Sequence, residues 1–174
     1  ITFARDITFE KEAAKEKEKL LTLLADKNKK INSSINYANR IQKAILGDIK
    51  AIESKFKDAF IYFSPRDVVS GDFYWYNIVG NKLVIAAVDC TGHGVPGAFM
   101  SLIGHTSLNN IVLEQQITEP HIILDKLHYR IKSVLHQEGD SISKDGMDVA
   151  LCVIDLESNN MTYAGAMRPL YIIR

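Results

Sequence analysis

The sequence contains 174 residues, of which 47% are hydrophobic, and its 21 basic and 21 acidic residues give a formal net charge of zero. This length predicts one domain with an appendage, and the hydrophobic fraction is sufficient for a core. The zero net charge gives no indication of binding to nucleic acid, and no apolar run approaches the roughly 20 residues of a membrane-spanning helix. Two cysteines, Cys90 and Cys152, make no disulfide framework, so we expect a cytoplasmic location.

The first nine residues predict the end of an upstream domain. The chain begins at Ile1 and not at methionine, which we expect of a piece of a longer protein. The alternation of Ile1 and Phe3 favours a short strand, and the ARDIT segment resembles the last strand of a PAS sensor domain. A disordered leader is the alternative.

A charged segment without glycine or proline predicts a helix over residues 10–47, ended by Gly47 and Asp48. Two interleaved series with a spacing of seven run along it: Leu24, Ile31, Ala38 and Ile45 in one, and Leu20 and Ile41, interrupted by Lys27 and Ser34, in the other. This pattern predicts a coiled coil that joins two copies of the chain. Packing on its own domain is the alternative, which Ile35 and Tyr37 favour near the C-terminal end.

Residues 48–174 predict a single α+β domain. Gly80-Asn81 indicates a tight hairpin turn between strands at Ser70–Val79 and Lys82–Asp89. The other expected elements are strands at Phe56–Phe63, Val149–Asp155, Met161–Ala164 and Leu170–Ile173, and helices at Ala98–Val112 and Glu119–His136. Thr118 is the expected N-cap of the second helix, and Pro120 suits its first turn.

The segment Leu83–Ser101, LVIAAVDCTGHGVPGAFMS, carries the strongest functional signal. Its apolar run predicts a buried strand that ends at Asp89, and Gly92, Gly94 and Pro96 indicate a turn into a helix. A buried carboxylate needs a partner or a metal, and glycines let the backbone approach a ligand. An aspartate that only caps the helix is the alternative.

A second aspartate, Asp72, stands at another strand boundary in the segment SPRDVVSGDFYWY, between Gly71 and an aromatic run. Two strand-edge carboxylates, each beside glycine, suit a hard divalent cation with oxygen ligands.

Together, SGDFYW and DCTGHGVPGAFMS resemble the SpoIIE-type branch of the protein phosphatase 2C family, over about residues 36–174. The resemblance implies a β-sandwich flanked by helices and two Mn²⁺ or Mg²⁺ ions. It implies that Asp89 bridges the metals and that Asp72 and the backbone carbonyl of Cys90 are further ligands. The substrate is then phosphoserine or phosphothreonine on a regulatory protein, commonly an anti-sigma-factor antagonist.

Several positions receive weaker assignments. His93 is a possible general acid, with loop packing as the alternative. Asp148 opens a strand and is expected to satisfy loop N–H groups, with proximity to the metals as the less favoured interpretation. The segment AGAMRPLYIIR resembles the family's penultimate hairpin, where relatives often carry AGH at the position of Ala164–Ala166. The histidine is absent here, so no role is assigned to this segment. The resemblance also implies aspartates in SDG and DD segments, and none occurs before Arg174, so we expect only half of the metal site.

Three functional hypotheses follow. The first is a phosphatase domain that is active in a longer parent and largely inactive as residues 1–174. The second is a noncatalytic module that binds a metal or a partner on the same fold. The third is a dimeric signalling connector in which the N-terminal helix carries the function.

Overall fold

The computed structural model describes residues 8–46, 52, 56, 58–137 and 145–173. The PAS-like strand predicted for the first residues therefore lies largely outside the described residues, as does the predicted helix end at Gly47 and Asp48.

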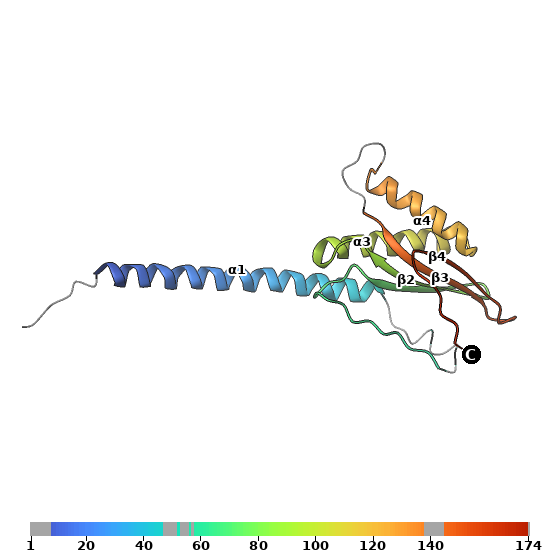
Figure 1. Ribbon diagram of the computed structural model, residues 1–174, viewed down its shortest axis with the longest axis horizontal. Coiled ribbons are helices and arrows are strands. Elements are labelled where there is room, and N and C mark those ends of the chain that lie inside the picture. Colours follow the sequence, from blue (N-terminus) through green and yellow to red (C-terminus); the bar gives the residue numbers. More distant parts are fainter. Residues whose placement is uncertain (1–7, 47–51, 53–55, 57, 138–144, 174) are drawn as a thin grey trace, which may run out of the picture.

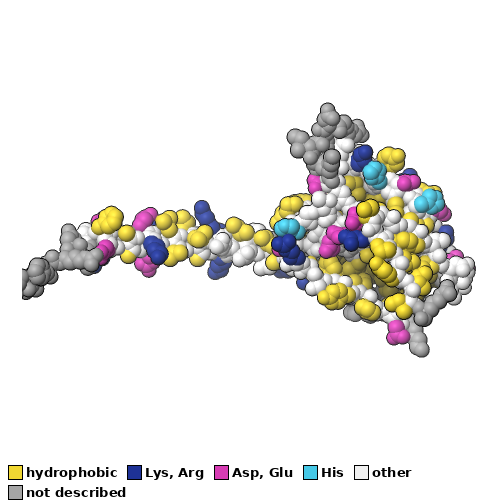
Figure 2. Space-filling model, viewed as in Figure 1, with side chains coloured by type: hydrophobic (Ala, Val, Ile, Leu, Met, Phe, Trp, Pro, Cys, Tyr) yellow, Lys and Arg dark blue, Asp and Glu magenta, His cyan; other side chains and the backbone are white. Residues whose placement is uncertain are grey.

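Helix α1 (Thr8–Leu46) projects away from the rest of the molecule (Figure 1). Its 39 residues correspond to a length of roughly 58 Å. Apolar side chains of both seven-residue series, Leu20, Leu24, Ile31 and Ile41, are about half exposed. Figure 2 shows hydrophobic and charged side chains interspersed along this helix. Only its C-terminal end packs on the body of the molecule, where Leu46 is buried.

A four-stranded antiparallel sheet forms the centre of the body. Its strands β1 (Phe73–Val79), β2 (Lys82–Cys90), β3 (Met147–Asp155) and β4 (Met161–Ala166) lie in the order β1-β2-β3-β4. The predicted hairpin is confirmed: Val79 pairs with Lys82 across the two-residue turn, and Gly80 has a φ of 60°. This left-handed conformation is the one that such a turn requires.

Three helical segments cover one face of the sheet (Figure 1): α3 (Gly94–Leu108), the π-helical segment η1 (Asn109–Glu114) and α4 (Pro120–Val134). Helix α3 begins four residues before the predicted start, so Pro96 lies in its first turn as expected. The N-cap of α4 is Glu119 and not Thr118. The Thr118 hydroxyl instead accepts a hydrogen bond from Lys82 Nζ, at 3.0 Å.

The core lies between these helices and the sheet. Alternate strand residues point into it, as period-two side-chain placement requires. They include Phe73, Trp75, Val84, Ala86, Val88, Val149, Leu151 and Val153, which pack with Leu108, Ile111, Ile123 and Leu127. Trp75 also donates a hydrogen bond from Nε1 to Asn109 Oδ1 at 2.8 Å, which ties β1 to η1.

The opposite face of the sheet, here called the open face, is covered by none of the helices among the described residues (Figure 1). It carries half-buried Tyr74, Tyr76, Ile85 and Cys152. The expected fold class, a helix-flanked antiparallel α+β domain, is confirmed. Within the part of the chain that is described, the sheet is single, and a second sheet of the expected sandwich is not formed.

Two predicted strands are absent from the described residues. The described part of Phe56–Phe63 has no ladder partner, and Phe60 and Tyr62 are 88% and 86% exposed. This segment lies beside β1, where the ring of Phe63 meets that of Tyr74 edge-on at 5.8 Å. Residues 170–173 also form no strand, because the chain leaves β4 at Met167 with a left-handed φ of 59°. Among the described helices, none is long and apolar enough to cross a bilayer.

Candidate metal centre

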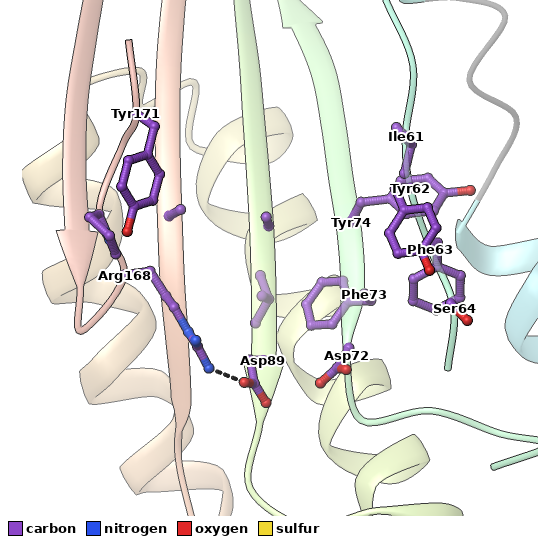
Figure 3. A pocket seen from close by; sticks show the side chains of 14 residues that line it. Ile61, Tyr62, Phe63, Ser64, Asp72, Phe73, Tyr74, Asp89, Arg168 and Tyr171 are labelled. Atoms are coloured by element: carbon purple, nitrogen blue, oxygen red, sulfur yellow. Dashed lines mark hydrogen bonds and ion pairs between the residues drawn. The ribbon is translucent and has the colours of Figure 1, made fainter. Parts of the chain in front are cut away.

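Three carboxylates form a row across one end of the open face. Phe73 pairs with Val88, so Asp72 follows next to Asp89, and Asp89 in turn pairs with Asp148 on β3. Because Phe73, Val88 and Val149 point into the core, their neighbours in sequence must point to the open face. Figure 3 shows Asp72 and Asp89 side by side at the ends of their strands. Asp72, Asp89 and Asp148 are called the carboxylate row below.

The electrostatic environment of Asp72 includes its neighbour in the row, Asp89. Burial raises the pKa of Asp72 above its usual value. The side-chain hydrogen bond that protonated Asp72 makes to Asp89, and the negative charge of Asp89, raise it further. The positive charge of Arg168 acts in the opposite direction. Two carboxylates that lie side by side favour either a shared proton or a bound cation.

Backbone contacts between glycines bring the two motifs together. A Cβ atom on Gly71 would lie 2.7 Å from the carbonyl oxygen of Gly92 and 3.3 Å from that of Cys90. A Cβ atom on Gly97 would lie 2.6 Å from the Gly92 oxygen and 3.0 Å from Gly71 Cα. The start of β1, the loop after β2 and the first turn of α3 therefore touch without any intervening side chain. The sequence predicted such a close approach from glycine, and the contact is to other backbone.

Cys90 and the loop after it take the expected positions. The thiol of Cys90 is buried in the core, opposite to Asp89, and burial raises its pKa to about 12. A neutral thiol facing the core is not a metal ligand. Gly92 and Gly94 have φ values of 86° and 61°, which a non-glycine residue adopts only with strain.

His93 does not face the carboxylate row. Its Nδ1 atom lies 2.9 Å from Asp67 Oδ2, and its side chain is 70% exposed at the start of α3. It is not among the residues that line the groove of about 480 Å³ over Asp72 and Asp89. The loop-packing interpretation of His93 is the one that this position supports.

Gln42 connects α1 to the segment that carries Asp72. Its Nε2 donates to the Ser70 carbonyl at 2.6 Å and to Ser101 Oγ at 2.9 Å, and its Oε1 accepts from the Ser70 N–H at 3.0 Å. The Ser70 hydroxyl then accepts from the Asp72 N–H at 3.0 Å. One amide on α1 therefore holds the backbone two residues before Asp72. Gln42 belongs to neither of the two seven-residue series along the helix, so that pattern gave no indication of its role.

Sequence reasoning missed Arg168 and assigned Asp148 the wrong environment. Arg168 forms an ion pair with Asp89, and its Nε lies 3.4 Å from Asp148 Oδ2 (Figure 3 shows the contact with Asp89). Asp148 thus lies in the row, the interpretation that the sequence favoured less. Arg168 lies in the segment AGAMRPLYIIR, to which the sequence assigned no role. Only the register between β2 and β3, strands separated by 56 residues of chain, could have revealed the position of Asp148. The position of Arg168 depends on the turn of the chain at Met167.

The donors of the carboxylate row match, in part, what the Mn²⁺ or Mg²⁺ ions that the resemblance implies would require. Its oxygen donors are of the kind that these hard cations prefer, and Asp72 and Asp89 are adjacent. Within the described residues, no three Asp, Glu, His or Cys side chains converge closely enough to hold a metal by themselves. The donor chemistry therefore fits, and the ligand set of the described chain is partial.

Comparison with known proteins defines the class. The family model described as Stage II sporulation protein E (SpoIIE) matches residues 80–174, more than half of the chain. The chain belongs to this family of PP2C-type phosphatase domains. Among solved structures, the SiaA-PP2C domain of Pseudomonas aeruginosa is similar, with 34% sequence identity and a TM-score of 0.71. The match covers 81% of this chain and 55% of that one, so the chain spans about half the length of the solved domain. Comparison with curated proteins gave no match.

Proposed function

We propose that this chain is part of a Mn²⁺- or Mg²⁺-dependent phosphatase that hydrolyses phosphoserine or phosphothreonine on a regulatory protein in cytoplasmic bacterial signalling. The observation that carries the proposal is the pair Asp72 and Asp89, side by side at the end of one hairpin, with the pKa of Asp72 raised. Membership in the SpoIIE family supports the same reaction class. An anti-sigma-factor antagonist is the substrate type that the resemblance suggests.

In this proposal Asp72, Asp89 and the backbone carbonyl of Cys90 hold the metal ions. Metal ions of this kind lower the pKa of a bound water and offset the charge that develops on phosphoryl oxygens. The chain itself holds the two carboxylates in position. The Gly71, Gly92 and Gly97 contacts fix the two carboxylates relative to each other, and Gln42 fixes the segment before Asp72.

Substitution of the carboxylates tests the proposal. Asp89→Asn should abolish Mn²⁺-dependent release of phosphate from a phosphoserine peptide, and Asp72→Asn should reduce it strongly, because each removes a negative charge from the ligand set. The assay uses a chain that also carries the further family aspartates, since residues 1–174 alone should show little turnover. Asp125→Asn, on the exposed side of α4, is the matched control. Wild-type activity of Asp89→Asn at saturating Mn²⁺ would refute the metal assignment.

We further propose that α1 pairs with α1 of a second copy. The observation in favour is that Leu20, Leu24 and Ile31 remain about half exposed along a helix that stands away from the body. Ile31→Asp would bury a charge in this seam, and we expect the dimer to weaken by at least about tenfold. Asn32→Asp introduces the same charge off the seam and should have little effect. A wild-type chain that sediments as a monomer at every concentration would contradict the proposal.

The same exposed seam favours one alternative function, the dimeric signalling connector in which the globular part is passive. Substitution of Asp89 in a chain with α1 intact, compared with deletion of the exposed part of α1, discriminates between them. The phosphatase proposal expects the substitution of Asp89 to abolish signalling even with α1 intact, whereas the connector expects signalling to depend on α1 alone.

A further inference from the structure

The chain itself supplies a cation to the carboxylate row, the guanidinium of Arg168. Asp72, Asp89 and Asp148 bring three acidic groups to one end of the open face, and the guanidinium of Arg168 lies between two of them. Its Nη2 donates to Asp89 Oδ2, and its Nε lies 3.4 Å from Asp148 Oδ2. A planar guanidinium suits this arrangement because its donors can serve two carboxylates at once.

The backbone around Arg168 is shaped to deliver this side chain. The hydroxyl of Tyr163 donates to the carbonyl oxygen of Arg168, and Met167 adopts a left-handed φ of 59°. A side chain at position 165 would collide with both the Arg168 carbonyl oxygen and the Tyr163 hydroxyl, so Gly165 leaves the space for this fold-back. The turn after β4 therefore returns across the open face, and an isolated bridge between Met167 and Val149 fixes it beside β3.

The contact is also easily broken. The side chains of Arg168, Asp89 and Asp148 are 45%, 48% and 42% exposed, so water can replace each partner. Release of the guanidinium needs only rotation about side-chain bonds, because the carbonyl contact with Tyr163 holds the backbone and not the side chain. The ion pairs of Arg168 with Asp89 and Asp148 are therefore exposed enough for water or another cation to replace the guanidinium.

We infer that Arg168 is a displaceable counter-cation of the carboxylate row, which a divalent cation must expel before it can bind Asp89. This inference rests on the proposed metal site. The oxygen that Arg168 occupies, Asp89 Oδ2, belongs to the residue that the proposal gives to the metals. A guanidinium and a divalent cation at the same oxygen repel each other, so one excludes the other. Arg168 would therefore lower the affinity for metal while it neutralises part of the row in the metal-free chain.

The test compares Mn²⁺ affinity across wild type and four variants of residues 1–174, with Asp89→Asn as the baseline that lacks the proposed metal ligand. Affinity is measured from the electron paramagnetic resonance signal of unbound Mn²⁺, a method that suits weak binding. Arg168→Ala removes the competitor and should bind Mn²⁺ about tenfold more tightly than wild type. Tyr163→Phe keeps every charge and removes only the hydroxyl that holds the turn, and we expect about two- to fivefold tighter binding. Arg130→Ala removes an exposed arginine from α4, on the other side of the sheet, and should leave the affinity unchanged.

The Tyr163→Phe variant separates displacement from a general field effect. If the charge of Arg168 acted only at a distance, Arg168→Ala would bind more tightly and Tyr163→Phe would match wild type, and the inference would be wrong. Equal Mn²⁺ affinity in wild type and both variants would also overturn it while leaving the metal site intact. If neither wild type nor any variant bound Mn²⁺ more tightly than Asp89→Asn does, the proposed metal site would fail, and the displacement inference with it.

Discussion

Replacement of Gly71 by alanine measures how tightly the two glycine motifs are packed. The added Cβ would lie 2.7 Å from the carbonyl oxygen of Gly92, 3.3 Å from that of Cys90 and 3.4 Å from Gly97 Cα. All three are backbone atoms, so no flexible side chain can move aside. The strand start that carries Asp72 and the loop that follows Asp89 must therefore separate.

The required shift gives the magnitude. Ordinary contact begins at 3.4 Å, so the Gly92 oxygen must retreat by about 0.7 Å from its 2.7 Å position. Overpacking of this kind costs about 1–3 kcal/mol. Gly71 has no positive φ, so alanine also gains about 0.4–1 kcal/mol by restricting the unfolded chain. We expect a net loss of about 1–2 kcal/mol in the free energy of unfolding, together with weaker Mn²⁺ binding.

Two other glycines provide matched controls in the same urea-unfolding assay. Gly146 has open space around its missing side chain and no positive φ, so Gly146→Ala should be neutral or stabilising by up to about 1 kcal/mol. Gly80 also has open space, but its φ is 60°, so Gly80→Ala should lose about 1 kcal/mol through backbone strain alone. Of the three, only Gly71→Ala should alter metal binding. If Gly71→Ala unfolded at the same urea concentration as Gly146→Ala, the backbone contact would not be as close as described.

Two further predictions concern buried polar groups. Gln42→Leu leaves the Ser70 N–H and carbonyl without their partner in a buried position, so we expect a loss of about 1–3 kcal/mol in urea unfolding, whereas the exposed Asn32→Leu should change it little. Burial raises the pKa of Cys90 from 9.0 to about 12, so the folded state keeps its proton where the unfolded state loses it, and stability should fall as pH rises between these values. Cys90→Ala should remove that part of the alkaline decline, and an unchanged decline in the variant would assign it to other groups.

The site could be predicted as far as local chain geometry reaches. Gly80-Asn81 sets a two-residue turn, and counting back along both strands then places Asp72 beside Asp89. The alternation of side chains likewise places the Cys90 thiol in the core, opposite to Asp89. Both predictions depend on residues fewer than twenty positions apart.

The rest depended on pairings that the sequence does not specify. Asp148 lies opposite Asp89 only because β3 pairs with β2 in one particular register after 56 intervening residues. Arg168 reaches the row only because Met167 turns the chain back. The segment Phe56–Phe63 has the composition of a strand, yet its described residues find no ladder partner, and composition alone cannot supply one.

The connection lengths within the sheet have a consequence for the order of folding. The β1–β2 hairpin closes across two residues, whereas β2 and β3 are joined by the whole helical layer, residues 91–146. The entropy of loop closure grows with the length of the loop, so we expect the hairpin to form early and β3 to dock late. Asp72 and Asp89 would then repel each other in the nascent hairpin before Asp148 and Arg168 arrive. Divalent cations present during refolding should accordingly speed the formation of the β1–β2 hairpin and not the docking of β3.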